Sequence, residues 1–336
     1  MKAVLTGATG FIGGAVARRL ADEGVAVHAL TRPGADRTRL AGRPIVFHDG
    51  DFTDPADLVG LFDGATWVIH AAGMLGRAGV SEAEYRRVNA EGARVFLAAA
   101  AEATRAGRTT ADLRVLHVST AGVLGPIRVE QADNLRYDEC AAPAPSNAYE
   151  RSKALAEGYA AALAAAGLPL VVARPEFIYG PGDRHVLGLF RAIQRGQFFY
   201  IGDGGNTCHP TYVDDLVDGL LACLRVGAPG GVYTIAGPRT LTFRELAETI
   251  AAELGVRPPR WRAPRRLAWL GAAALEGIGR VTGRDVPLSR DGVAFFSESR
   301  GSSIARARAE LGYAPRVDLR EGVTRTVGWY RGEGLL

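Results

Sequence analysis

Residues 3–13 read AVLTGATGFIG, an apolar run followed by glycines at Gly7, Gly10 and Gly13, and a helical pattern continues over residues 15–20. Glycines allow a tight turn and let backbone N–H groups approach phosphate oxygens closely. The N-terminus of the helix that follows adds partial positive charge. The stretch therefore predicts a strand, a glycine turn and a helix that bind a dinucleotide pyrophosphate, although a glycine turn alone also occurs in ordinary strand–helix connections.

The pattern of the next 160 residues predicts the fold class. Apolar runs that read as strands are residues 3–6, 25–30, 44–47, 67–71, 115–119 and 170–173. Helical patterns lie between them and include residues 54–62, 81–103 and 147–166. Strands that alternate with helices predict a doubly wound parallel α/β sheet of the Rossmann type, with helices on both faces. Ligands of such a sheet bind at the carboxyl ends of the strands.

After residue 175 the pattern loosens, and we expect a smaller mixed α/β lobe that binds substrate. The predicted Rossmann domain is 1–175 and also receives 205–236, which leaves 176–204 and 237–336 for the lobe. Helices are expected over 185–195 and 213–224 and up to residue 254, with a strand at 232–235. One further helical stripe, which we expect to be a packed face rather than a membrane-binding surface, consists of Leu267, Leu270, Ala274, Ile278 and Val281.

Composition excludes several other classes. The net charge of +4 and the pI near 9.1 are too modest to indicate nucleic-acid binding. No apolar run is long enough for a membrane span, and the first strand begins too early to leave room for a signal peptide. Cys140, Cys208 and Cys223 are few and scattered, which favours a reducing cytoplasm and no metal site. Residues 257–266 are rich in arginine and read as a solvated connector, with a membrane or partner contact as the alternative.

A second motif lies far downstream, where residues 149–153 read YERSK. Tyr149 and Lys153 are four residues apart, so on a helix they share one face. A phenol beside an ammonium is suited to proton transfer. Together with the spacing Gly7-x-x-Gly10-x-x-Gly13, the pair resembles the extended short-chain dehydrogenase/reductases of the NAD-dependent epimerase/dehydratase superfamily. Within that family the chain is most similar to the 3β-hydroxysteroid dehydrogenase and dihydroflavonol reductase branch.

The resemblance implies a set of cofactor-binding residues at the strand ends. Besides the three glycines, these are Thr9, Phe11, Ile12, Asp51, Phe52, Ala71, Ala72, Gly73, Asn89, Ser119, Tyr149, Lys153, Pro175, Phe177 and Ile178. Asp51 would accept a hydrogen bond from the adenine amino group, and Asn89 would organise the strand ends near the nicotinamide. The backbone at Phe177 and Ile178 would contact the carboxamide.

The end of the second predicted strand decides between the two nicotinamide cofactors. An acidic residue there binds the ribose 2′-hydroxyl of NAD, whereas an arginine accommodates the 2′-phosphate of NADP. Arg32 stands at this position, and no carboxylate appears until Asp36. We therefore favour NADP(H), with NAD(H) as the alternative if Arg32 only faces solvent.

The resemblance also implies the chemistry, which couples proton transfer to hydride transfer. Thr120, or failing it Ser119, would hold the substrate oxygen at the end of the fifth strand. Tyr149 would exchange a proton with that oxygen. A free tyrosine has a pKa near 10, and positive charge from Lys153 and the oxidised nicotinamide would favour the phenolate. Lys153 would also hydrogen-bond the nicotinamide ribose.

Departures from the family pattern narrow the activity. Dehydratases carry an Asp-Glu pair after the catalytic threonine, and related decarboxylases carry a Glu, but here Ala121 and Gly122 stand there and cannot transfer protons. Cys208 replaces the arginine that binds the diphosphate of nucleotide sugars, although Arg284 or Arg300 could compensate. Residues 209–215, HPTYVDD, and the apolar second lobe resemble the hydroxysteroid branch.

We therefore predict an NAD(P)(H)-dependent oxidoreductase that interconverts a ketone and a secondary alcohol on a mostly apolar small molecule. Candidate substrate contacts are Met74, Glu176, His185, His209 and Tyr212, of which Glu176 would either touch substrate or pair with an arginine. Two alternatives remain, a nucleotide-sugar epimerase with tightly bound NAD and a non-catalytic NADP-binding sensor. Related proteins often dimerise through the helices expected at 81–103 and 147–166, so we expect a homodimer.

Overall fold

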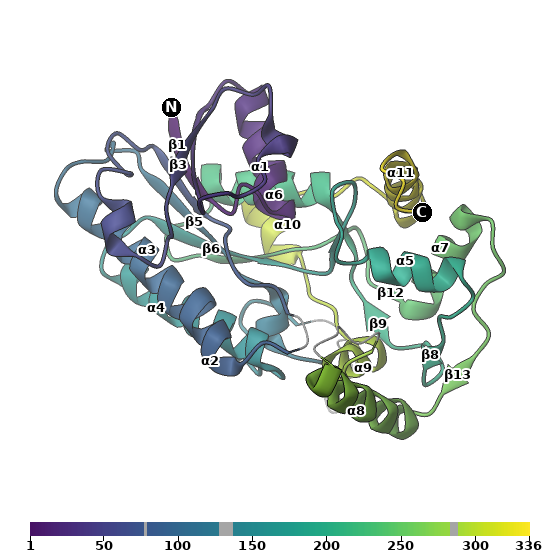
Figure 1. Cartoon of the computed structure of the whole chain (residues 1–336). Helices are drawn as coiled ribbons and strands as arrows, with labels where there is room; N and C mark the ends of the chain where they lie inside the picture. Colours follow the sequence, from purple (N-terminus) through teal and green to yellow (C-terminus); the bar gives the residue numbers. More distant parts are fainter. Residues whose placement is uncertain (77–78, 128–136, 283–287) are drawn as a thin grey trace.

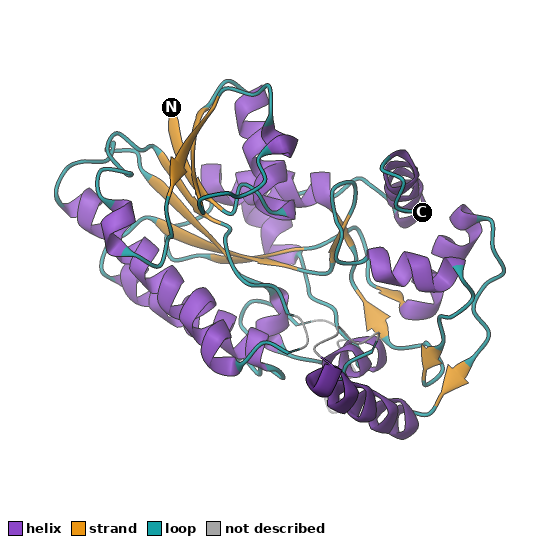
Figure 2. Cartoon of the chain, in the orientation of Figure 1, coloured by secondary structure: helices purple, strands orange, loops and turns teal. Residues whose placement is uncertain are grey.

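A seven-stranded parallel sheet forms the centre of the chain (Figures 1 and 2), and its strand order is β11-β6-β5-β4-β1-β2-β3. This computed structural model describes residues 1–76, 79–127, 137–282 and 288–336. The strands are β1 Lys2–Thr6, β2 Ala26–Thr31, β3 Ile45–Asp49, β4 Trp67–His70, β5 Arg114–Val118, β6 Leu170–Pro175 and β11 Val232–Ile235. The order reverses between β1 and β4, which is where doubly wound sheets bind ligands. The predicted Rossmann fold is confirmed.

Helices cover both faces of this sheet (Figure 1). On one face lie α1 Phe11–Asp22, α6 Val213–Val226 and α10 Ala305–Leu311, and on the other lie α3 Gly92–Arg105 and α4 Ala148–Ala165. Each face has its own apolar core, because nearly all strand residues of β1, β4, β5 and β6 are buried. The C-terminal segment returns to the sheet, since α10 packs against α6 and β11 although the sequence division places it in the lobe.

A buried ion pair ties α4 to the sheet. Arg174 of β6 donates through Nη2 to the Glu157 carboxylate of α4 at 2.7 Å, with side chains 6% and 10% exposed. The start of α4 is fixed by Asn147, whose side chain accepts the Glu150 N–H at 2.9 Å. These contacts set the rotation of α4, and therefore which of its side chains face the carboxyl ends of the strands.

Two predicted helices differ from the structure in form. Residues 54–62 make only the short 3₁₀ segment Pro55–Leu58, because Asp54 caps one turn and Gly60 then has a φ of +72°. The stretch 81–103 is split into α2 Glu82–Tyr85, the π-helical segment Arg86–Glu91 and α3. π-helical turns in natural proteins often occur at functional sites, and this one contains Asn89.

The smaller lobe consists of short strands and helices beside the sheet (Figure 1). Its helices are α5 Leu187–Gln194, α7 Phe243–Leu254, α8 Arg265–Thr282, α9 Arg290–Ser297 and α11 Leu319–Gly332. Its two-residue strands are β7 Ile178–Tyr179, β8 Tyr200–Ile201, β9 Thr207–Cys208, β10 Thr211–Tyr212, β12 Leu241–Thr242 and β13 Arg262–Ala263. Across the described ranges, no helix combines the length and apolar character required to cross a bilayer.

The structure corrects the expectation for the apolar stripe of α8. Leu267, Leu270 and Ile278 are 63%, 60% and 59% exposed, and Ala274 is exposed as well. The side chain of Val281 lies outside the described ones. The opposite side of the helix is the packed one, where Ala268 and Ala272 meet Val293 of α9. Periodicity identified the stripe correctly, but the stripe is a surface and not a packed face.

Candidate active site

Two positions of the glycine turn after β1, Gly7 and Gly13, have no room for a side chain. Gly7 has a φ of +79°, and a Cβ atom there would lie 2.8 Å from the backbone of Ala71 and Ala72. A Cβ at Gly13 would lie 2.2 Å from the Gly7 carbonyl oxygen. The turn after β1 therefore touches the loop after β4, with Thr6 Oγ1 accepting the Ala72 N–H at 3.3 Å. Gly10 starts α1 without a side-chain cap, so the helix N-terminus keeps N–H groups for an anionic ligand.

Arginines gather at the carboxyl ends of β2 and β3. Arg32 is exposed, as a residue that meets a bound phosphate would be. Arg37 donates to Thr31 Oγ1 at 2.7 Å and forms an ion pair with Asp49. Arg39 donates to the Gly182 carbonyl at 2.7 Å, which links this edge of the sheet to the loop after β7. The sequence assigned the 2′-phosphate contact to Arg32. It gave no contacts for Arg37 and Arg39, because the positions of these two side chains depend on the course of the loop after β2.

The remaining predicted adenosine contacts lie along the same edge. Asp51 follows β3, and its Oδ1 accepts the Thr53 N–H at 2.9 Å. Phe52 is half-buried and packs edge-on against His70, with ring centroids 5.2 Å apart. The loop that contains Ala71, Ala72 and Gly73 follows β4 directly. Thr9, Phe11 and Ile12 lie where the glycine turn enters α1.

Asn89 connects the loop after β4 with α4. Its Oδ1 accepts the Met74 N–H at 2.6 Å, and its Nδ2 donates to the Met74 carbonyl at 3.0 Å and to Ser152 Oγ at 3.1 Å. The Asn89 residue is 2% exposed, and its bond to Ser152 is buried, whereas the two bonds to Met74 are partly buried. Asn89 thereby fixes Met74, a predicted substrate contact, relative to the helix that carries Tyr149 and Lys153.

Tyr149 and Lys153 project from the first turns of α4 toward the end of β5. Burial and the charge of Glu150 together raise the pKa of Tyr149 to about 12, although a hydrogen bond with Thr120 opposes them. Burial lowers the pKa of Lys153 to about 8, and its Nζ donates to the Val118 carbonyl at 2.7 Å. Burial therefore favours the protonated phenol.

Thr120 and Ser119 end β5 beside this pair. Thr120 Oγ1 accepts the Gly122 N–H at 3.1 Å, which leaves its own hydroxyl proton to donate. The Ser119 hydroxyl is buried and has no hydrogen-bond partner among the described residues. A buried hydroxyl without a partner is costly unless a ligand satisfies it, so Ser119 fits a site that holds a cofactor.

Two stacked imidazoles lie beneath Lys153. The rings of His70 and His117 are 5.4 Å apart at an interplanar angle of 15°. Burial and the charge of Lys153 lower the pKa of both, that of His70 to about 3. His70 is bonded to Thr6 Oγ1 through Nδ1 at 2.8 Å. Both rings are therefore neutral near pH 7, and they place no positive charge under the site.

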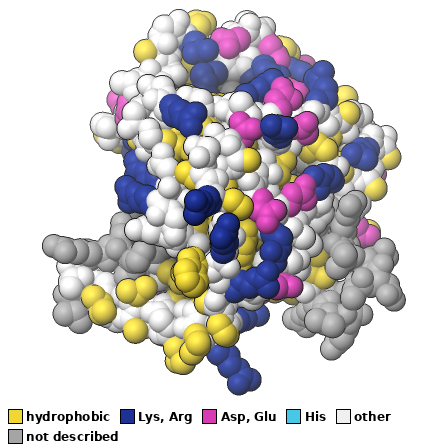
Figure 3. All heavy atoms as spheres, turned by 90° about the vertical axis from the view of Figure 1, so that its right-hand side faces the viewer, with side chains coloured by type: hydrophobic (Ala, Val, Ile, Leu, Met, Phe, Trp, Pro, Cys, Tyr) yellow, Lys and Arg dark blue, Asp and Glu magenta, His cyan; other side chains and the backbone are white. Residues whose placement is uncertain are grey.

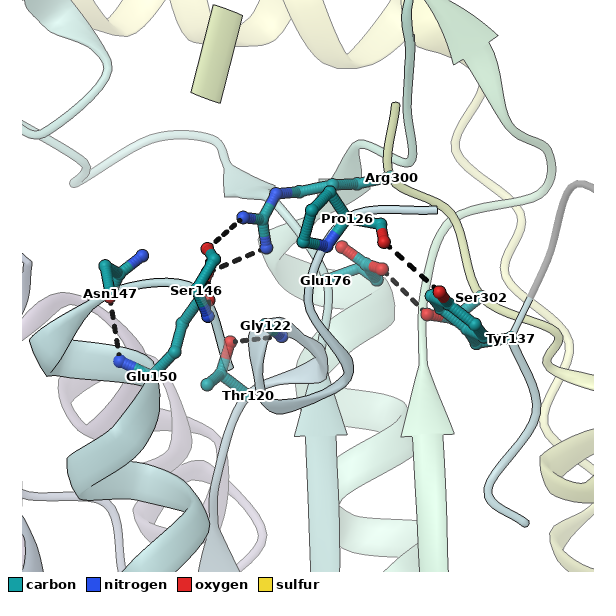
Figure 4. Close-up of polar contacts among 10 residues, drawn as sticks. All are labelled: Thr120, Gly122, Pro126, Tyr137, Ser146, Asn147, Glu150, Glu176, Arg300 and Ser302. Carbon is teal, nitrogen blue, oxygen red and sulfur yellow. Dashed lines mark hydrogen bonds and ion pairs between the residues drawn. The ribbon is translucent and has the colours of Figure 1, made fainter. Parts of the chain in front are cut away.

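The sequence did not predict an ion pair of Glu150, the residue that follows Tyr149 in α4, with Arg300 (Figure 4). Arg300 Nη1 meets Glu150 Oε1 at 2.7 Å, with side chains 14% and 6% exposed. Arg300 also donates to Ser146 Oγ at 3.2 Å, and Glu150 Oε2 accepts the Ser146 N–H at 2.7 Å. A Cβ at Gly122 would lie 3.2 Å from Glu150 Oε1 and 3.3 Å from Thr120 Oγ1. Glu150 therefore lies beside Gly122, close to the catalytic candidate Thr120.

Glu176 is buried on the other side of Arg300 (Figure 4). Its Oε1 accepts the Ser302 hydroxyl at 2.8 Å. Burial raises the pKa of Glu176, while Ser302 and the charge of Arg300 lower it. The expected arginine is thus near, but its ion pair is with Glu150. The sequence motif YERSK contains Glu150, so this carboxylate could have been noted as a residue near the site. Its partner Arg300 lies 150 residues away, and no local pattern indicates that the two pair.

The loop after β6 carries the predicted nicotinamide contacts. Pro175 ends β6, and Ile178 begins β7, which pairs with β10. Between them Phe177 packs against Phe243 and Phe295, with ring centroids 6.4 and 5.4 Å away. Its carbonyl accepts the Thr211 N–H at 2.8 Å. The loop therefore leaves the central sheet at β6 and is held by elements of the smaller lobe.

Three predicted substrate contacts lie in packed or peripheral places. His185 is exposed at the turn before α5. His209 is 2% exposed and bonded through Nε2 to the Gly237 carbonyl at 2.9 Å. Tyr212 is 3% exposed, stacks edge-on against Tyr179, and lies under Arg325. Cys208 is also buried, and Arg284 lies outside the described residues, so Arg300 is the one proposed diphosphate substitute whose contacts are known.

Comparison with known proteins agrees with this geometry. The sequence model of the NAD dependent epimerase/dehydratase family matches residues 3–236. The 2-alkyl-3-oxoalkanoate reductase of Stenotrophomonas maltophilia is 29% identical over 97% of this chain and 98% of that protein. The 4-hydroxy-2-methyl-3-oxo-4-farnesyl-3,4-dihydroquinoline-1-oxide ketoreductase of Stigmatella aurantiaca is 31% identical over 96% of this chain and 95% of that protein.

Solved structures show the same relationship. The dTDP-glucose 4,6-dehydratase of Streptomyces venezuelae, crystallised with NAD, superposes with a TM-score of 0.77 at 26% identity. The match covers 99% of this chain and 97% of that one. The glycine turn, the strand order and the Tyr149–Lys153 helix lie within the segment that the family model matches. The chain belongs to the NAD-dependent epimerase/dehydratase family, among the extended short-chain dehydrogenase/reductases.

Proposed function

We propose that the protein reduces a ketone to a secondary alcohol on a mostly apolar small molecule, using NADP(H). The observation that carries the proposal is the placement of Thr120, Tyr149 and Lys153 at the end of β5, where Tyr149 is hydrogen-bonded to Thr120 and Lys153 donates to the Val118 carbonyl. Because the pKa of Tyr149 is raised, the phenol keeps its proton at neutral pH, and it could pass that proton to a carbonyl oxygen as the arriving hydride makes this oxygen basic. The bound dinucleotide supplies the hydride.

In the proposed reaction, each of four side chains at the end of β5 and the start of α4 has its own role. The Thr120 hydroxyl donates a hydrogen bond to the substrate oxygen, since the Gly122 N–H already occupies one of its lone pairs. Tyr149 gives its proton to the same oxygen. Lys153, with its pKa lowered to about 8, remains largely protonated at pH 7 and donates to the nicotinamide ribose while held by the Val118 carbonyl. Ser119 would gain a partner in the cofactor.

The lack of a carboxylate at positions 121 and 122, directly after Thr120, supports simple reduction rather than dehydration. Residues 121 and 122 carry no carboxylate, and the Glu150 carboxylate near them is engaged by Arg300 and Ser146. The two reductases similar to this chain are named for ketones that carry alkyl or farnesyl groups. We place the apolar part of the substrate against Met74 and Phe177, with Glu176 as a polar contact. The roles of His185, His209 and Tyr212 as substrate contacts stay predictions.

The preference for NADP rests on the arginines after β2. Arg32 is exposed and Arg37 lies at the same strand ends, while Asp49 is engaged by Arg37. Asp36, the first carboxylate after β2, accepts hydrogen bonds from the N–H and the hydroxyl of Thr38. We also propose a homodimer through α3 and α4, the predicted dimer helices, which light scattering coupled to gel filtration would show as a mass of twice 35.5 kDa.

The direct test replaces Tyr149 by Phe. We expect turnover to fall roughly 10²–10⁴-fold, the usual contribution of a general acid, while NADPH binding by fluorescence is unchanged. Tyr159→Phe on the exposed side of the same helix is the matched control and should keep full turnover. If Tyr149→Phe retains wild-type turnover, or if the wild type binds NADPH but reduces no ketone, the proposed function is wrong.

A further inference from the structure

Helix α8 has its large apolar residues outside and its small ones inside. Ala268 and Ala272 face α9 and are 7% and 0% exposed. On the opposite side, Leu267, Leu270 and Ile278 are each about three-fifths exposed. A surface helix ordinarily turns its large apolar side chains toward the core. The exposed residues have the spacing i, i+3, i+7 and i+11, so they form one continuous apolar stripe on the protein surface. They are Leu267, Leu270, Ala274 and Ile278. An exposed apolar stripe of this kind indicates a surface that binds another apolar surface.

The chain that leads into α8 carries a dense positive charge. The segment between Gly255 and Leu275 contains no aspartate or glutamate. All of its arginines are exposed, and they are Arg257, Arg260, Arg262, Arg265 and Arg266. Trp261 is 76% exposed among them, and Trp269 is 45% exposed in the first turns of the helix. Hydrophobic side chains with Lys and Arg beside them gather along the lower edge of Figure 3, the level at which α8 lies in Figure 1.

This surface is one helix away from the candidate active site. α8 packs on α9, and Phe295 of α9 contacts Phe177 in the predicted nicotinamide loop at 5.4 Å between ring centroids. The same segment continues into Arg300 and Ser302, which contact Glu150 and Glu176. A membrane or protein that covers α8 would therefore lie one helix away from the loop that carries Phe177.

We propose that α8 and the preceding residues 257–264 bind the surface of a lipid bilayer that contains anionic lipids. Helices that lie flat in a membrane interface combine an apolar face with flanking cations, and tryptophan favours the same depth. The charge is complementary to anionic headgroups, and each arginine near such a surface contributes about fivefold in affinity. The 18 residues of α8 would lie along the interface, with the apolar stripe toward the acyl chains.

The position of the surface suggests what the contact is for. An apolar ketone partitions into bilayers, so a reductase docked beside its own substrate region can take the molecule from the membrane. This purpose rests on the proposed function, but the binding of lipid does not. A second copy of the chain is less suited to the surface. Arg265 pairs with Glu298, but two such faces in contact would still bring eight other arginines together, four from each copy.

The test is co-sedimentation with vesicles, and it needs no substrate. Wild-type protein is mixed with vesicles of phosphatidylglycerol and phosphatidylcholine, or of phosphatidylcholine alone. We expect binding to the anionic vesicles that weakens with salt, and much weaker binding to the zwitterionic ones. The triple change L267Q/L270Q/I278Q should reduce binding to the anionic vesicles more than tenfold. The triple change R257Q/R260Q/R266Q should reduce it about a hundredfold on anionic vesicles, at about fivefold per arginine.

The matched control is Val59→Gln with Val226→Gln, which are 82% and 60% exposed on other elements and should leave binding unchanged. Failure of the wild type to bind anionic vesicles would overturn the inference. Equal loss in the control, or a dimer by light scattering that the α8 changes convert to monomer, would overturn it too. NADPH turnover on a water-soluble ketone without vesicles is measured in parallel, so that loss of the proposed function and loss of lipid binding are told apart.

Discussion

Arg300→Met should destabilise the protein strongly, because it leaves the Glu150 carboxylate buried without a cation. The two side chains are 14% and 6% exposed, and their atoms are 2.7 Å apart. Removing one member of a buried pair costs about 3–5 kcal/mol in the free energy of unfolding, and the partial exposure of Arg300 places this case near 3 kcal/mol. Glu150→Gln should cost less, because Ser146 can still donate to the amide oxygen.

The assay is urea unfolding followed by tryptophan fluorescence, for both single variants and for the double variant. The double variant should lose less than the sum of the two by at least about 1 kcal/mol, since neither charge is then left alone. Arg87→Met, which breaks the exposed pair with Glu84, serves as the control and should leave the midpoint unchanged. Additive losses, or a loss for Arg300→Met no larger than for Arg87→Met, would refute the reasoning about the buried pair.

Three further outcomes are expected. Gly13→Ala should abolish NADPH binding, measured by fluorescence titration, because its Cβ would lie 2.2 Å from the Gly7 oxygen, whereas Gly158→Ala meets nothing within 4 Å and should bind normally. Arg32→Glu should lower the preference for NADPH over NADH at least tenfold in kcat/KM, and an unchanged ratio would exclude Arg32 as the 2′-phosphate partner. The pKa of His70 is about 3 in the fold and 6.5 in a free chain, so the unfolded state binds more protons between these values and stability falls as pH drops below 6.5. From pH 7 to pH 5 this group alone should cost about 2 kcal/mol, and His70→Gln should flatten that dependence in thermal unfolding.

The sheet could be predicted from the sequence because its strands and turns are determined by residues that are close together in the chain. Apolar runs at regular intervals identify strands, and the glycines of residues 7–13 identify the turn through contacts within a few residues. The site residues that lie on strand ends followed from the same order. Asn89 was expected near the nicotinamide, but its bonds to Met74 and Ser152 depend on a π-helical turn that no pattern indicated.

What could not be predicted is set by contacts between distant segments. The pairing of Glu150 with Arg300 joins residues 150 positions apart. For α8, the sequence predicted an apolar stripe but not that this stripe is exposed. Periodicity shows that one side of a helix is apolar, but not what covers it. The pKa of Tyr149 likewise depends on its burial, which no local sequence pattern gives.

The measurement that tests the central claim most directly is cofactor absorbance at 340 nm. Purified protein is mixed with NADPH, and separately with NADH, against apolar ketones that include 2-alkyl-3-oxo acids and steroids. The account predicts steady loss of NADPH with at least one of these ketones and little loss of NADH. Consumption of neither cofactor by a folded protein, together with NAD released on denaturation, would contradict it and favour an epimerase that keeps its cofactor bound.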